Sequence, residues 1–226
     1  MAGEHFSFPA FHNRDRELTE GDIARMELAQ ELRGLIYGSF MSTAPTERIL
    51  EIRTEVARLR DALAETGAPG TAAAESHFSD RSPFYGAMNP LSMPMKLSFE
   101  EGTGEFGAVL GDVVFTEPYE GPPGHCHGGF IAGAFDEVLG MTQSLTGRPG
   151  MTGKLSITYR SPTPLHTNIR FRGWVDRVDG RKIFTKGTAH NGDTLCAEAE
   201  ALFLSMPEEL MHRLRKGRDL SNPAND

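Results

Sequence analysis

The chain has 226 residues, of which 38% are hydrophobic and 24% charged, as in an ordinary globular protein of one domain, with or without an appendage. Its net charge of −8 argues against nucleic acid or an anionic membrane surface as the main partner. Two cysteines, Cys126 and Cys196, are too few for a disulfide framework or for a four-ligand zinc site of their own.

Neither a membrane span nor a secretion signal is expected. No stretch approaches about 18 uninterrupted apolar residues, the length that a helix needs to cross a bilayer. The first residues, Met-Ala-Gly-Glu-His-Phe-Ser-Phe, lack the basic segment and the apolar core of a signal peptide. The sequence therefore predicts a cytoplasmic protein.

Residues 1–76 are expected to form an N-terminal arm and a helical hairpin. One helix begins at Thr19, with Thr19 or Asp22 as its cap, and ends near Gly38. A second follows Thr43-Ala-Pro-Thr, and its apolar residues are spaced three, four, three, four: Ile49, Ile52, Val56, Leu59 and Leu63. This seam is too short for an independent coiled coil, so we expect it to pack on its neighbour helix or on another subunit. A linker follows over residues 67–76.

Over residues 77–207 the hydrophobic pattern is no longer the helical one of the N-terminal residues. This change predicts a second unit, followed by a tail over 208–226. Loop signals fill residues 77–95, and the helix described below interrupts a series of strands. Asp179-Gly180 and Asn191-Gly192 predict tight hairpins. Strands are predicted over 95–101, 107–116, 151–160, 168–178, 182–191 and 194–205. The pattern indicates an α+β fold, an antiparallel sheet wrapped around one helix.

That central helix follows a Gly-Pro loop and His127-Gly128-Gly129. It contains an apolar run from 130 to 139, interrupted only by Asp136 and Glu137, so we expect a helix buried nearly all round. An ionised aspartate there is costly unless it is paired or functional. Its neighbour Glu137 points about 100° away on a helix and is expected to be structural or at an interface. Glycine costs about 1 kcal/mol in a helix, so interior glycines at 133 and 140 predict close approach of another segment.

The strand over 151–160 alternates polar and apolar residues. A period of two places its polar side chains on one face: Thr152, Lys154, Ser156, Thr158 and Arg160. One interpretation is the solvent-facing side of a half-buried strand. The other is a polar track from a reactive centre toward an anionic part of a long substrate.

Several motifs with their spacings carry a resemblance to a known family: Gly121-Pro-Pro-Gly, His127-Gly-Gly, Asp136 nine residues after that histidine, Met151-Thr152, Tyr159-Arg-Ser-Pro-Thr-Pro-Leu and Asp179-Gly-Arg-Lys. Residues 83–207 resemble the hot-dog fold thioesterases. Within that fold they are similar to the branch with the bacterial phenylacetate-pathway thioesterases and the mammalian thioesterase superfamily members 4 and 5. The N-terminal helices lie outside this resemblance.

The resemblance implies hydrolysis of acyl-CoA to free acid and CoA by a homodimer with its active site at the subunit interface; assembly of two dimers into a tetramer stays open. It implies that Asp136 acts as general base or nucleophile, that Thr152 of the partner subunit positions water, and that the Gly129 N–H polarises the carbonyl. Neither metal nor cofactor is implied, because CoA is part of the substrate. Further residues are implied to bind substrate or CoA: Gly128, Phe130, Thr158, Arg160 and Arg181.

Some residues have alternative roles. His127 could act in the chemistry, as base or thioester ligand, or could position the loop. His125-Cys126-His127 would suit a metal, but no second cluster in the sequence completes a site. Cys126 lacks an evident third group to orient a base, which argues against a nucleophilic cysteine.

Two rival functions follow from the same fold. The first is a non-catalytic acyl-CoA-binding or sensing protein whose N-terminal helices bind DNA. Residues 1–75 contain 8 Arg, no Lys and 13 acidic residues, a net negative charge that is the wrong sign for phosphate binding. The second is a hydratase or dehydratase with Asp136 and His127 as its acid/base pair. The N-terminal extension itself is expected to cover an acyl tunnel or to extend the dimer interface.

Overall fold

The computed structural model describes residues 17–65, 78–93, 95–101, 104–148 and 150–206. Most of the predicted N-terminal arm lies outside these residues, and so do the linker and the C-terminal tail. The elements in chain order are α2 (Glu20–Met41), α3 (Thr46–Ala64), η2 (Phe78–Arg81), β1 (Lys96–Glu100), β2 (Ala108–Val114), η3 (Glu117–Tyr119), α5 (Gly128–Ser144), β3 (Gly150–Tyr159), β4 (Asn168–Asp179), β5 (Lys182–Asn191) and β6 (Thr194–Ser205).

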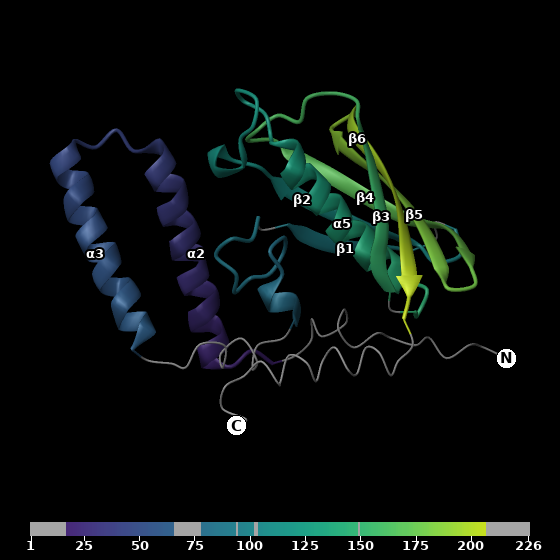
Figure 1. The fold of residues 1–226 in the computed structure, drawn as a ribbon, viewed down its shortest axis with the longest axis horizontal. Helices are drawn as coiled ribbons and strands as arrows, with labels where there is room; N and C mark the ends of the chain where they lie inside the picture. The colour runs from purple at the N-terminus through teal and green to yellow at the C-terminus, as the bar shows by residue number, and fades with distance from the viewer. Residues whose placement is uncertain (1–16, 66–77, 94, 102–103, 149, 207–226) are drawn as a thin grey trace.

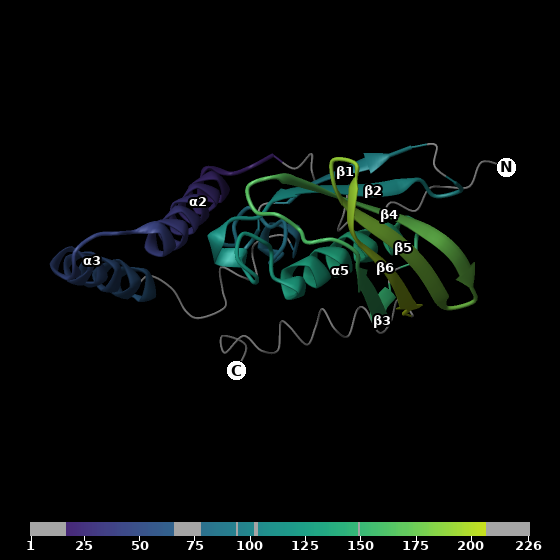
Figure 2. The same ribbon diagram turned by 90° about the horizontal axis from the view of Figure 1, so that it is seen from above.

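The strands form a six-stranded antiparallel sheet in the order β1-β2-β4-β5-β6-β3. Figures 1 and 2 show α5 lying along one face of this curved sheet. The predicted α+β architecture is therefore confirmed. The two hairpin signals are also confirmed, because Gly180 and Gly192 turn the chain with φ of 54° and 56°, a region that glycine adopts without steric cost. Strand β3 lies at one end of the sheet order and presents a free edge.

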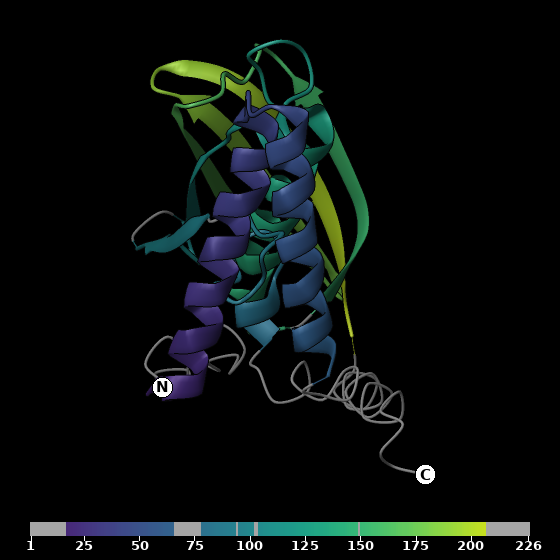
Figure 3. The ribbon, with the colours of Figure 1, turned by 90° about the vertical axis from the view of Figure 1, so that its left-hand side faces the viewer.

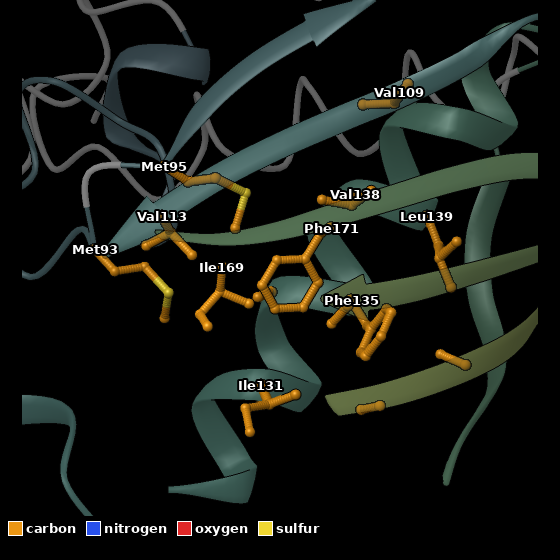
Figure 4. Packing of buried hydrophobic residues seen from close by; sticks show 14 of the residues in the cluster. Met93, Met95, Val109, Val113, Ile131, Phe135, Val138, Leu139, Ile169 and Phe171 are labelled. Carbon is orange, nitrogen blue, oxygen red and sulfur yellow. The ribbon is translucent and has the colours of Figure 1, made fainter. Parts of the chain in front are cut away.

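The core lies between α5 and the facing side of the sheet. Figure 4 shows side chains from both layers meeting there, among them Phe135 of α5 and Phe171 of β4. Their rings pack edge to face with centroids 5.0 Å apart. Gly173 allows the close approach of the helix, since a Cβ at that position would lie 2.5 Å from the Thr142 hydroxyl. The tight fit fixes the position of α5 over the sheet.

Helix α5 is not buried all round, contrary to the sequence prediction. Its core face carries Ile131, Ala134, Phe135, Val138 and Leu139, all nearly inaccessible to solvent. The opposite face remains outward, and Asp136 on it is exposed. The apolar run overstated the burial, because Phe130, Ala132 and Gly133 count as apolar in the pattern yet are exposed or only partly buried.

The N-terminal helices form the predicted hairpin beside the domain. Thr19 and Asp22 cap α2 reciprocally, with the Asp22 N–H donating to the Thr19 hydroxyl at 3.1 Å. Helix α2 continues past Gly38 to Met41. It packs on the domain through Ala29, which is 1% exposed, and through a hydrogen bond of 2.9 Å from Arg33 to the Asn89 carbonyl.

Helix α3 lies farther from the domain than α2, and Figure 3 shows the two side by side from that end. No residue of α3 is buried, and the seam residues Ile49 and Leu59 are 43% and 52% exposed. The neighbour helix therefore does not bury the predicted seam. Of the two packing partners expected from the spacing, only another subunit remains open. No helix in the described ranges has the length and apolar character to cross a membrane.

Candidate active site

Asp136 and Thr152 meet on the outward side of α5. The Thr152 hydroxyl donates to Asp136 Oδ1 at 2.9 Å, and both residues are exposed. The sequence resemblance implied a threonine from the partner subunit, but here the threonine of the same chain reaches the aspartate. Helix α5 and the edge strand β3 of one chain thus assemble this pair.

A β-bulge at Gly153 explains how Thr152 reaches the helix. On β6, Thr152 pairs with Phe203 and Lys154 with Leu202, so Gly153 is an extra residue in β3. One extra residue reverses the alternation of faces. The prediction that all five polar residues of the strand share a face is therefore wrong. Thr152 lies on the helix side, whereas the next three polar residues face away from it: Lys154, Ser156 and Thr158.

His127 caps the N-terminus of α5. Its ring Nδ1 accepts the Gly129 N–H at 3.0 Å, so the ring is a hydrogen-bond acceptor at Nδ1. The Gly128 N–H, at the first position of the helix, has no hydrogen-bond partner in the described part of the chain. The Gly128 carbonyl accepts the Tyr159 hydroxyl at 2.8 Å, which ties the helix start to β3. The open donor at the helix start is thus Gly128 and not the expected Gly129.

Glu137 points away from this pair into the protein. Its Oε2 accepts the Ser82 hydroxyl at 3.1 Å, and Ser82 is 3% exposed. Burial raises the pKa of Glu137 to about 7, an effect that the Ser82 hydrogen bond opposes and the nearby Asp136 charge reinforces. The two adjacent carboxylates therefore have opposite surroundings, as expected for neighbours on a helix.

The residues implied for CoA binding do not converge in one chain. Arg160 follows the end of β3 that pairs with Ala197, and its guanidinium forms an ion pair with Glu198. Arg181 lies at the opposite end, where its Nε donates to the Ser205 carbonyl at 3.2 Å. Nine residues of strand separate these ends by about 30 Å. Thr158 faces away from the helix, and a single chain brings neither arginine to Asp136.

Phe130 lies at the start of α5, where its ring packs edge to face on Tyr119 with centroids 5.1 Å apart. Just before the helix, Cys126 is 4% exposed, and burial raises the pKa of its thiol to about 12. It stays protonated and is therefore a poor nucleophile. The His125 Nδ1 lies 2.8 Å from the Pro123 carbonyl. The described residues contain no group of three or more His, Cys, Asp or Glu side chains placed to hold a metal ion.

Comparisons with known proteins show the family of the chain. The sequence profile of the thioesterase superfamily matches residues 123–200. The crystal structure of a thioesterase superfamily protein is 30% identical, and the match covers 80% of this chain and 90% of that one with a TM-score of 0.70. The chain belongs to the thioesterase superfamily. Residues 66–226 alone are less than 80% of the chain, so the match to that crystal structure extends into the N-terminal helices, farther than the sequence resemblance did.

Two curated relatives of the chain are named acyl-coenzyme A thioesterases. THEM4 of Xenopus laevis is 37% identical over 92 residues, which are 39% of this chain and 41% of the relative. THEM4 of Mus musculus is 34% identical over 123 residues, 50% of this chain and 53% of the relative. The chain thus spans roughly half the length of the curated relatives it matches.

In this thioesterase superfamily member the pair of Asp136 and Thr152 lies on an open surface. Two hollows of about 550 Å³ each occur elsewhere, one lined by residues of the β4 end and the other beneath α2. Neither has Asp136 or Thr152 in its wall. The hydrogen-bonded pair is the stronger candidate, because among the described residues its carboxylate contacts a hydroxyl and no cation, whereas Asp176 in the first hollow is held by ion pairs with Arg177 and Lys186.

The sequence interpretation gave no role to Tyr159 or to the segment around Ser82. Tyr159 lies within a quoted motif, but strict alternation placed it with the buried residues of the strand. That face is the helix side of β3, where the Tyr159 hydroxyl reaches the Gly128 carbonyl. Gly153 is instead the signal for the reversal at Thr152, because an isolated glycine in a strand often marks a bulge. No local pattern marks Ser82 as a partner of Glu137, 55 residues away.

Proposed function

We propose that this protein hydrolyses acyl-CoA thioesters to a free acid and CoA. The observation that carries the proposal is the pair of Asp136 and Thr152, joined at 2.9 Å, on the helix whose first N–H, that of Gly128, is open. The names of the curated relatives support the choice of acyl-CoA as substrate. The reaction needs neither metal nor organic cofactor, because CoA is part of the substrate.

In the proposed mechanism, Asp136 takes a proton from a water molecule as its oxygen attacks the thioester carbonyl. Thr152 donates to Oδ1 and so leaves Oδ2 for this water. The carbonyl oxygen becomes an oxyanion, which the Gly128 N–H stabilises at the helix start; such a donor contributes about 3 kcal/mol. The C–S bond then breaks, and the CoA thiolate takes up the proton. Direct attack by Asp136 through an anhydride remains the alternative course.

We also infer that the active protein is a homodimer. The free edge of β3 and the exposure of Asp136 and Tyr159 support this, since a second chain could cover the site. A partner could also bring its own arginine, Arg160 or Arg181, to a CoA bound at the first chain. The mass in solution, by light scattering, tests the inference and separates a dimer from a dimer of dimers. A monomer with full activity would contradict it.

The experiment for the activity is CoA release from a panel of acetyl-, phenylacetyl- and palmitoyl-CoA, with wild type and Asp136→Asn. We expect wild type to release CoA and the variant to lose about 100-fold or more of kcat, because the amide cannot accept the proton. Circular dichroism should show that the variant is folded. Binding of acyl-CoA without turnover by wild type would favour a non-catalytic binding or sensing protein, and hydration of enoyl-CoA would favour the hydratase.

A further inference from the structure

An aromatic ring covers the outward face of α5 next to the reacting pair. Phe84 lies over Gly133, and a Cβ at that glycine would lie only 2.5 Å from Phe84 Cε1. The space that a side chain at 133 would fill is thus occupied by a residue 49 positions earlier in the chain. The close approach predicted for the two interior glycines occurs at Gly133, where a side-chain ring and not a backbone approaches. At Gly140 it does not occur, because a Cβ there would have Phe203 as its nearest neighbour, at 3.9 Å.

Gly133 precedes Asp136 by three residues on the same side of the helix. Three residues advance along a helix by about 4.5 Å and rotate about its axis by about 300°. The two positions therefore lie roughly 60° apart around the helix. The Phe84 ring over Gly133 therefore lies less than one helical turn from the Asp136 carboxylate. Thr152 of β3 bounds Asp136 on one side. Phe84 bounds the same outward face on the other.

Hydrogen bonds at Ser82 hold this ring in place. The Ser82 hydroxyl donates to Glu137 Oε2 at 3.1 Å and accepts the N–H groups of Phe84 and Tyr85 at 3.1 and 3.4 Å. The segment thus contacts the helix at positions 133 and 137, one turn apart on the same side of the helix. A ring fixed in this way is a rigid surface that a substrate meets without rearranging it.

We propose that Phe84 forms a wall of the acyl site and determines which acyl groups reach Asp136. This inference rests on the proposed thioesterase activity. A thioester carbonyl placed between Gly128 and Asp136 carries two substituents, the acyl group and the CoA sulfur. The half-buried, apolar ring favours contact with the acyl group, because the CoA portion is polar and strongly anionic.

The test compares kcat/KM for acetyl-, octanoyl-, phenylacetyl- and palmitoyl-CoA among wild type, Phe84→Ala and Phe84→Leu. Removing the ring enlarges the site, so the ratio for a bulky acyl group over acetyl should rise about tenfold or more in Phe84→Ala, and less in Phe84→Leu. The leucine variant keeps an apolar side chain over Gly133 and covers the case in which the alanine variant fails to fold.

Phe99→Ala is the matched control. Phe99 also packs over a glycine, Gly107, but lies on β1, at the opposite end of the sheet order from β3. Its removal should leave the acyl preference of wild type unchanged. An equal factor for every acyl group in both Phe84 variants would overturn the inference and leave the thioesterase activity standing. No CoA release by wild type from any acyl-CoA would instead overturn the proposed function, and the inference with it.

Discussion

Asp136 and Glu137 are adjacent carboxylates with opposite surroundings. Asp136 is exposed and accepts a hydrogen bond from Thr152, whereas Glu137 is largely buried and accepts one from Ser82. Burial raises the pKa of Glu137 to about 7, because its ionised form is poorly solvated there. Near neutral pH it exists in part as a neutral acid. Helix geometry thus separates a group exposed to substrate from one that attaches the Phe84 segment.

Glu137→Gln should make the protein more stable at high pH. The native pKa lies above the ordinary value of 4.5, so the stability of wild type should fall as pH rises from about 4.5 through 7 and then level off. Glutamine is neutral and can still accept from Ser82. We therefore expect a gain of at most about 3 kcal/mol at pH 8 and little or none at pH 4. Urea unfolding at both pH values measures this, and an equal difference at both would refute it.

At the scale of the element, the bulge in β3 determines which side chains reach the helix. The strand was predicted over 151–160 and lies over Gly150–Tyr159, yet its alternation reverses at Gly153. The bounds depend on hydrogen-bonded length, whereas the facing of each side chain depends on the register. A single extra residue leaves the bounds of the strand unchanged but moves the following side chains to the opposite face.

Deleting Gly153 should therefore remove Thr152 from Asp136. The loss of kcat should match that of Thr152→Ala, while the circular dichroism spectrum retains its β content. Gly153→Ala is the control, because a Cβ there would lie 3.4 Å or more from its neighbours and should leave the bulge in place. Full activity of the deletion variant would show that the bulge does not position Thr152.

At the scale of the whole molecule, the described part of the chain leaves the edge of β3 and the seam of α3 uncovered. No residue of α3 is buried, whereas most helical stability in proteins comes from the packing of an apolar face. Packing of the seam on another subunit stays a prediction from its spacing. The cytoplasmic location likewise stays a prediction from the sequence.

Ile52→Glu tests the role of the seam. A charge at a packed seam position is costly to desolvate, so the variant should shift the mass in solution toward the monomer. Thr54→Glu on the exposed side of α3 is the control and should leave the mass unchanged. Light scattering over a range of protein concentrations measures both. An unchanged mass in Ile52→Glu would show that the seam does not contribute to assembly.

Local chemistry determined much of the fold. The hairpin glycines, the cap at Thr19 and the alternation of β5 and β6 act over a few residues, and both strands have the bounds predicted for them: Lys182–Asn191 and Thr194–Ser205. The motifs likewise placed Asp136 and the helix start, because residue types at fixed spacing on one helix have fixed geometry. Register and long-range contact required the tertiary structure. Thr152 reaches Asp136 only through a bulge, His127 takes the N–H expected to be free, and Ser82 and Phe84 reach α5 across about 50 residues. These contacts depend on how distant segments pack together, and packing leaves no periodic signal in the sequence.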